Sequence, residues 1–251
     1  MSLASAAGVL RFAALGDSIN VGIGSPMPDG GWRGWAALLA PALAAPSWVE
    51  LHNFAVSGAL TRDVAGPQLA ATLRLRPQLA SIIVGVNDTL RNRFDVAAIQ
   101  AALTGCVAAL TAQGSLVLTA RLPVHVDVAT HPTVYDRSMW SVDRLHPSER
   151  GHRLLARRFA EALAASGFPL AGRPASQPDN PEPTRHAQAW WMASQGTRWV
   201  LRRGADLLPG LLGMAAGEWW CGIRGAASTF DDGLRRDVAA ALDRMEDRIV
   251  A

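Results

Sequence analysis

The chain has 251 residues and a mass of 26.6 kDa, and 49% of the residues are hydrophobic, which is enough for one fair-sized globular domain plus an appendage. The formal net charge is only +3 although the sequence pI is about 9.6, and the basic residues are all arginines scattered along the chain. This dispersed charge argues against nucleic acid as a partner and is more typical of a GC-rich genome.

The N-terminal residues and the cysteines indicate a cytoplasmic protein. Arg11 interrupts the stretch where a signal peptide would need an unbroken apolar run. Cys106 and Cys221 lie in different predicted helices without metal or redox spacing, so we expect reduced thiols. Every histidine except His146 is expected to have a packing or surface role. The sequence therefore predicts no metal site.

Predicted strands and helices alternate along the first two thirds of the chain. Apolar runs that end in glycine or in polar residues predict strands at 9–15, 49–55, 79–84, 115–120 and 124–128. Helical spacing covers residues 32–43, 63–75, 95–113 and 147–166, with Asp63 as a cap and Pro147 in a first turn. This alternation is typical of an α/β fold, a parallel sheet with helices on both faces.

Four polar segments follow these strands: Gly16 to Ser18, Asn53 to Gly58, Gly85 to Asp88, and Asp143 to His146, which includes Arg144 and Leu145. Ligands of such sheets bind outside the carboxyl ends of the strands. We therefore expect the segments to meet at one edge of the sheet.

Together the segments supply the groups of an ester hydrolase. Ser18 is the candidate nucleophile, His146 the base that takes its proton, and Asp143 the group that orients the imidazole. Gly58 and Asn87 are candidate hydrogen-bond donors to the oxyanion. Each segment alone would be an ordinary turn or cap. Their joint occurrence on matching strand ends favours a catalytic site.

These segments resemble blocks I, II, III and V of the SGNH hydrolases, the GDSL family of esterases and lipases, over residues 9–163. The resemblance implies a flavodoxin-like, three-layer α/β/α fold. It also implies hydrolysis of a small-molecule or lipid ester through an acyl-enzyme on Ser18, without a metal or organic cofactor. The oxyanion hole would consist of the Ser18 and Gly58 N–H groups and the Asn87 amide, while Asp17 and Asp88 brace the loops.

The resemblance leaves the ester open: lysophospholipids, thioesters and acetylated carbohydrates are all candidates. The arginine-only composition and the tryptophan-rich tail look like an actinobacterial branch of the family. One feature departs from the family pattern, because only residues 121–123 join the predicted strands at 115–120 and 124–128. A parallel crossover needs at least about 10 residues. A noncatalytic or membrane-associated binding protein with a disabled site is therefore the alternative.

The sequence also predicts the domain organisation. Residues 1–168 form the hydrolase domain, 169–184 a proline-rich linker, and 185–251 a helical region rich in tryptophan and arginine. A membrane span is disfavoured there because the apolar run is short and interrupted. The tryptophans either pack on protein or make peripheral contact with anionic membranes.

Overall fold

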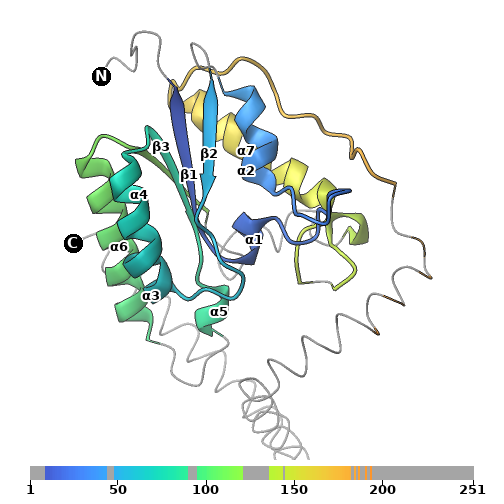
Figure 1. Ribbon diagram of the computed structural model, residues 1–251, viewed down its shortest axis with the longest axis horizontal. Coiled ribbons are helices and arrows are strands. Elements are labelled where there is room, and N and C mark those ends of the chain that lie inside the picture. Colours follow the sequence, from blue (N-terminus) through green and yellow to red (C-terminus); the bar gives the residue numbers. More distant parts are fainter. Residues whose placement is uncertain are drawn as a thin grey trace, which may run out of the picture. The chain divides into compact units, whose positions relative to one another are not determined.

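The computed structural model describes residues 9–43, 48–89, 95–120, 136–143 and 145–181, with the single positions 184, 186, 190 and 193. Within these residues, four parallel strands form one sheet in the order β2-β1-β3-β4 (Figure 1). The strands are β1 (Leu10–Gly16), β2 (Val49–Asn53), β3 (Leu79–Ile83) and β4 (Leu116–Thr119). The predicted strand at 124–128 and its short connection at 121–123 lie outside the described residues.

Helices cover both faces of the sheet, so the predicted three-layer α/β/α class is confirmed. The helices are α1 (Ser18–Val21), α2 (Trp35–Leu39), α3 (Thr61–Asp63), α4 (Leu69–Leu75), α5 (Val86–Thr89), α6 (Val96–Ala112) and α7 (Glu149–Ala165). A π-helical turn, η2 (Val64–Gln68), joins α3 to α4, and two 3-10 turns are η1 (Ala40–Ala42) and η4 (Arg137–Met139). Helices α2 and α7 pack on one face, and α4 and α6 on the other (Figure 1).

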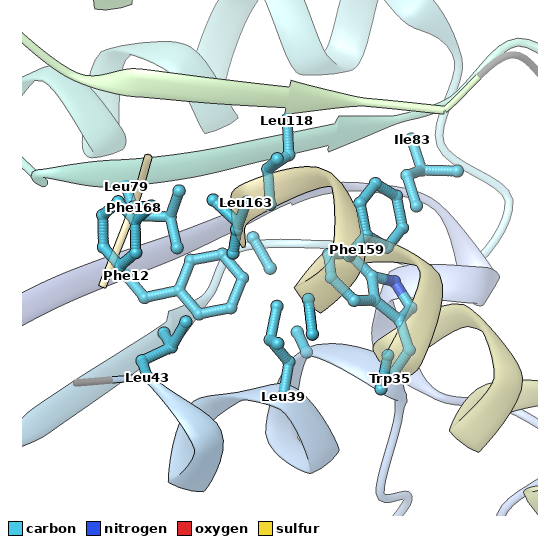
Figure 2. Packing of buried hydrophobic residues seen from close by; sticks show 14 residues of the cluster. Phe12, Trp35, Leu39, Leu43, Leu79, Ile83, Leu118, Phe159, Leu163 and Phe168 are labelled. Carbon is cyan, nitrogen blue, oxygen red and sulfur yellow. The ribbon is translucent and has the colours of Figure 1, made fainter. Parts of the chain in front are cut away.

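Alternation of side chains along β1 creates a core on each face. Phe12 and Ala14 join the cluster beneath α2 and α7, whereas Ala13 and Leu15 join the cluster beneath α4 and α6. In the first cluster, Figure 2 shows Trp35 beside Phe159, with ring centroids 4.2 Å apart in a stacked arrangement. The sheet is thus buried on both faces, as expected of parallel strands.

The strand order places a topological switch point at one edge. From β1 the chain goes to β2 on one side and then returns to β3 on the other side. The crevice outside the carboxyl ends of β1 and β3 is where such sheets bind ligands. Ser18 and Asn87 follow those two strands directly.

Three predicted helix starts are wrong. The first predicted helix begins at Trp35 and not at residue 32, because Gly34 is its N-cap. The second predicted helix begins at Thr61, and Asp63 lies in its first turn with its carboxylate accepting a hydrogen bond from the Leu60 N–H at 2.8 Å. An acidic side chain at this position reaches back to the cap and does not itself serve as the cap. In α7, Ser148 is the cap and Pro147 precedes it, because the Ser148 hydroxyl accepts from the Gly151 N–H.

The segment at 169–181 runs along the outside of the α2 and α7 layer (Figure 1). Leu170 bridges to Leu43, and the Ala171 N–H donates to the Ala42 carbonyl at 2.9 Å. The chain divides into two units, Met1–Gly196 and Thr197–Ala251, and the described residues all belong to the first. Most of the predicted 185–251 region lies outside the described residues, which contain no helix long and apolar enough to cross a membrane.

Candidate active site

Ser18 begins helix α1 directly beyond β1. The Asp17 carboxylate caps this helix by accepting from the Ile19 N–H at 3.1 Å, and the Asp17 N–H donates to the Ile83 carbonyl at 3.2 Å. These bonds fix the turn between two adjacent strands. The first amides of a helix have no intrahelical acceptor, so the Ser18 N–H points out of the helix end. Ser18 is 9% exposed, so the nucleophile segment is largely buried.

Asn20 connects the turn to the hydrophobic core. Its side chain is fully buried, donates to the Leu15 carbonyl and accepts from the Trp35 indole N–H at 2.7 Å. Its own carbonyl accepts from the Asn53 side chain at 2.7 Å, which ties the end of β2 to α1. The nucleophile segment is therefore held by the core beneath it.

His146 lies in a narrow loop that precedes α7. Trp140 and Pro147 form an antiparallel bridge, and the Ser141 N–H donates to the His146 carbonyl at 2.8 Å. One oxygen of Asp143 accepts from the His146 N–H at 3.0 Å and also from the N–H of the intervening leucine. The loop is thus organised around the Asp143 carboxylate.

The structure brings the three predicted catalytic side chains together. The Ser18 Oγ lies 2.9 Å from the His146 Nε2, and the His146 Nδ1 lies 2.6 Å from the Asp143 Oδ2. Burial raises the pKa of Asp143, but hydrogen bonds from His146, Ser141 and two backbone N–H groups outweigh it and hold the pKa well below the usual range. Asp143 is therefore ionised and can orient the imidazole.

A glycine allows the two loops to meet. Gly24 has a φ of +101°, and a Cβ at this position would lie 2.0 Å from the Pro147 carbonyl oxygen. A larger residue would push the loop after Ser18 away from the loop of His146.

The predicted oxyanion donors approach the same edge. Gly58 lies in a turn closed by a hydrogen bond from the Ala59 N–H to the Val56 carbonyl at 3.0 Å. The Asn87 amide donates to the Ala59 carbonyl at 3.2 Å and to the Asp17 carboxylate at 3.3 Å. Asn87 thus lies between the segments of Ser18 and Gly58, although its amide bonds to protein oxygen atoms.

Asp17 and Asp88 bond to neighbouring loops, as predicted. The Asp88 carboxylate accepts from the Thr61 N–H at 3.0 Å and from the Thr61 hydroxyl at 3.1 Å, which braces the turn after Gly58. Burial raises the pKa of Asp17, partly offset by the Ile19 N–H bond and by the nearby His146.

Sequence reasoning missed several residues that support the site: Asn20, Gln68, Ser141 and Glu149. Gln68 is buried and exchanges two hydrogen bonds with the Gly16 backbone, at 2.7 and 3.0 Å. A polar residue inside a helical pattern gives no signal of such a long-range contact. Within the described residues, no cluster of His, Cys, Asp or Glu could hold a metal ion.

Comparison with known proteins identifies the class. Residues 14–137 match the GDSL-like Lipase/Acylhydrolase family, a match that ends before Asp143 and His146. The chain therefore carries a GDSL-like lipase/acylhydrolase domain, and the protein is a hydrolase of the SGNH/GDSL class, as the motifs predicted. No curated protein matches the chain in sequence.

Three solved structures illustrate the similarity. TesA is 24% identical with a TM-score of 0.49, covering 62% of this chain and 98% of that one. The psychrotrophic esterase EstA from Pseudoalteromonas sp. is 21% identical with a TM-score of 0.46, covering 62% and 98%. An acetylxylan esterase from Geobacillus stearothermophilus is 18% identical with a TM-score of 0.45, covering 63% and 94%.

Proposed function

We propose that the protein hydrolyses carboxylic esters through an acyl-enzyme on Ser18. The observation that carries this proposal is the continuous chain of hydrogen bonds from Ser18 through His146 to Asp143. His146 takes the hydroxyl proton as Ser18 attacks the ester carbonyl, and then gives that proton to the leaving alcohol. Water next attacks the acyl-enzyme, with His146 again as base. Asp143 holds the Nδ1–H tautomer and stabilises the imidazolium that forms.

The tetrahedral intermediate needs donors for its oxyanion. The N–H groups of Ser18 and Gly58 and the side-chain amide of Asn87 are the proposed donors. The Asn87 amide donates to the neutral Ala59 carbonyl at 3.2 Å, and exchanging that bond for one to a full negative charge is favourable.

The alternative of a disabled site is disfavoured by the geometry. That hypothesis expects the Ser18 hydroxyl and the His146 imidazole to lie beyond the reach of a hydrogen bond or a single water. The separation of 2.9 Å is a direct hydrogen-bond distance. The short predicted connection at 121–123 therefore does not keep the loop of His146 away from Ser18.

The rim of the site favours an apolar acyl group. Val56, two residues before Gly58, is 59% exposed; Val86, next to Asn87, is 37% exposed; and Leu145, next to His146, is 55% exposed. Each of these exposed apolar side chains lies within two residues of a site residue in the sequence, and covering them with a hydrocarbon chain is favourable. We infer that the ester carries an alkyl chain longer than acetate.

A hydrolysis screen tests this function. Purified protein is assayed on p-nitrophenyl esters from acetate to dodecanoate, beside the Ser18→Ala variant. We expect hydrolysis by the wild type only, with kcat/KM rising from acetate to a longer acyl chain. Equal hydrolysis by Ser18→Ala would refute the acyl-enzyme, and a maximum at acetate would refute the apolar acyl site.

A further inference from the structure

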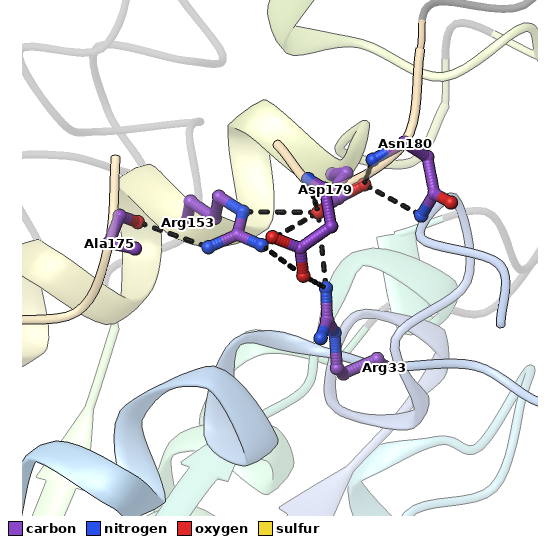
Figure 3. A network of polar contacts seen from close by, with 6 residues as sticks. Arg33, Arg153, Ala175, Asp179 and Asn180 are labelled. Atoms are coloured by element: carbon purple, nitrogen blue, oxygen red, sulfur yellow. Dashed lines mark hydrogen bonds and ion pairs between the residues drawn. The ribbon is translucent and has the colours of Figure 1, made fainter. Parts of the chain in front are cut away.

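A charged cluster lies beside the site without belonging to the proposed triad. Its centre is Glu149, the first residue of α7, which is 7% exposed and receives donors from three separate segments. Figure 3 shows the side chains of Arg33, Arg153, Asp179 and Asn180 gathered in this cluster. The donors to its carboxylate are Arg33 Nη2 at 3.1 Å, Arg153 Nε at 3.1 Å and Nη2 at 2.8 Å, Asp179 N–H at 2.7 Å, and the Asn180 N–H and Nδ2 at 3.2 and 3.0 Å.

The charges of this cluster balance. Asp179 brings a second carboxylate, which pairs with Arg33 and lies 2.8 Å from Arg153. Burial raises the pKa of Glu149, but the bonds from the Asp179 N–H, Arg153 and Asn180 lower it to about 2. Both carboxylates therefore face both guanidinium groups as ions at neutral pH.

Arg33 connects the cluster to the nucleophile. Its N–H donates to the Ser25 carbonyl at 2.9 Å, and the next residue, Gly34, touches Gly22, where a Cβ would lie 2.2 Å from the Gly34 nitrogen. The Gly22 N–H in turn donates to the Ser18 carbonyl at 3.1 Å. A displacement of Arg33 is therefore transmitted to the end of α1.

Glu149 connects the cluster to the base. It follows the cap Ser148, whose N–H donates to the Met139 carbonyl at 2.9 Å and whose hydroxyl donates to the Ser138 carbonyl at 2.5 Å. Those bonds close the loop that presents His146. The Arg33 to Glu149 ion pair thus joins the loop of the nucleophile to the loop of the base.

We propose that Glu149, Arg33 and Asp179 are positioning residues of the hydrolase. We also propose that the 169–181 segment helps to position the site and is not only a linker. The segment supplies Asp179 and Asn180, which bind both sides of the ion pair and keep it formed. The hydrogen bonds and ion pairs described for this cluster join its members to one another and not to Ser18, His146 or Asp143. Its role is to hold the Ser18 hydroxyl at hydrogen-bond distance from the His146 imidazole.

Full-length variants with partly exposed partners test this role. The side chains of Arg33 and Asp179 are 30% and 58% exposed, so Arg33→Gln and Asp179→Asn leave less uncompensated charge in the interior than a change of Arg153 would. A misplacement of about 1 Å costs about 100-fold in rate. We expect kcat to fall about 10- to 100-fold in Arg33→Gln and less in Asp179→Asn, with KM changed less than about twofold.

Further variants separate positioning from stability. Arg33→Lys keeps the charge and should recover part of the lost kcat. The double variant of Arg33→Gln and Asp179→Asn should be no slower than the slower single variant, because both break one unit. Glu161→Gln, which removes an exposed ion pair with Arg158 on the same helix, should leave kcat and KM unchanged.

The inference rests on the proposed function. Labelling by a fluorophosphonate therefore distinguishes a failure of the positioning role from a failure of the proposed function. The number of labelled sites gives the competent fraction, and kcat is expressed per labelled site. A lower kcat per site in Arg33→Gln supports positioning. An unchanged kcat per site with fewer sites, or a lower melting temperature alone, refutes positioning and leaves the proposed function intact. Absence of Ser18 labelling in the wild type refutes both.

Discussion

The segment of the nucleophile and the segment of the base are held in different ways. Ser18 lies on a turn between a buried strand and a short helix, and Asn20 anchors that helix to the core through Leu15 and Trp35. His146 lies in a loop that is held by Asp143, by Ser148 and by backbone bonds. The nucleophile is held by hydrogen bonds whose partners, Asn20 and Trp35, are fully buried in the core, whereas the base is held by hydrogen bonds within a partly exposed loop.

This difference determines how well each segment keeps its geometry after a substitution. The core packs around Asn20 and Trp35 through many atoms, so the turn of Ser18 survives the loss of one polar contact. A loop built from polar contacts loses its shape when one acceptor is removed, because the donors left behind are partly buried. Substitutions around His146 should therefore alter geometry more than substitutions around Ser18 do.

The largest expected effect is on the nucleophile and base themselves. Ser18→Ala and His146→Ala should each lower kcat by up to about 10⁶-fold, and the double variant should be no worse, because the two residues act as one unit. Ester hydrolysis by the purified variants measures this. Circular dichroism should show a folded protein, since each change removes few contacts. Multiplied losses in the double variant would contradict the shared role.

Asp143→Asn should have the next largest effect. It removes the negative charge that fixes the His146 tautomer, and the cost is about 10⁴-fold in kcat. It also weakens the acceptor for the Ser141 hydroxyl and for the loop N–H groups. Steady-state kinetics should show the loss in kcat, with Ser141→Ala as a milder control. A loss confined to KM would contradict the orienting role.

Asn87→Ala should lower kcat by about 100- to 1000-fold if its amide binds the oxyanion. Asp88→Asn is the matched control, because the Asp88 carboxylate bonds to Thr61 in the adjacent turn. We expect the control to cost far less. If the two variants were equally impaired, Asn87 would be a structural residue of the turn and not an oxyanion donor.

Buried His152 should make stability depend on pH. Burial lowers its pKa to about 4 from 6.5, partly offset by its bond to the Ile23 carbonyl, and the nearby His146 lowers it further. The folded state favours the neutral imidazole, so this contribution is complete above pH 6.5 and is lost as the pH falls toward 4. The loss is about 3 kcal/mol. Urea unfolding at several pH values measures it, and His152→Gln should flatten the dependence in that window.

The smallest expected effect concerns the rim. Leu145→Gln should lower kcat/KM about 10-fold for long acyl esters, since an apolar side chain that the bound acyl chain covers contributes about 1.5 kcal/mol. It should leave acetate hydrolysis nearly unchanged. Trp48→Gln, which alters an exposed apolar side chain preceding β2, is the control. Equal losses on short and long esters would mean that Leu145 shapes the loop and does not contact the acyl chain.

The sequence predicted the fold where local pattern and tertiary packing agree. Each of the four described strands was expected within two residues of its bounds, because a buried parallel strand must be an apolar run that ends in a turn. The convergence of Ser18, Gly58 and Asn87 followed from the same rule. The π-helical turn at Val64–Gln68 was not predicted, although Pro67 within it disturbs a regular ladder.

The supporting residues could not be predicted from local pattern. Glu149 after a serine cap is an ordinary favourable residue for a helix start, and nothing local indicates that Arg33 and Asp179 meet it. Likewise, nothing local indicates that Asn20 bonds to the indole of Trp35. Contacts between residues so far apart in the chain depend on the whole fold, and the 169–181 segment was therefore interpreted only as a linker.

Covalent labelling tests the central claim most directly. A fluorophosphonate reacts with a serine whose proton is taken by a neighbouring base, and peptide mass mapping identifies the labelled residue. We predict one label per chain, on Ser18, with labelling abolished in His146→Ala. A folded wild-type protein that remains unlabelled, or that is labelled at another serine, would contradict the account.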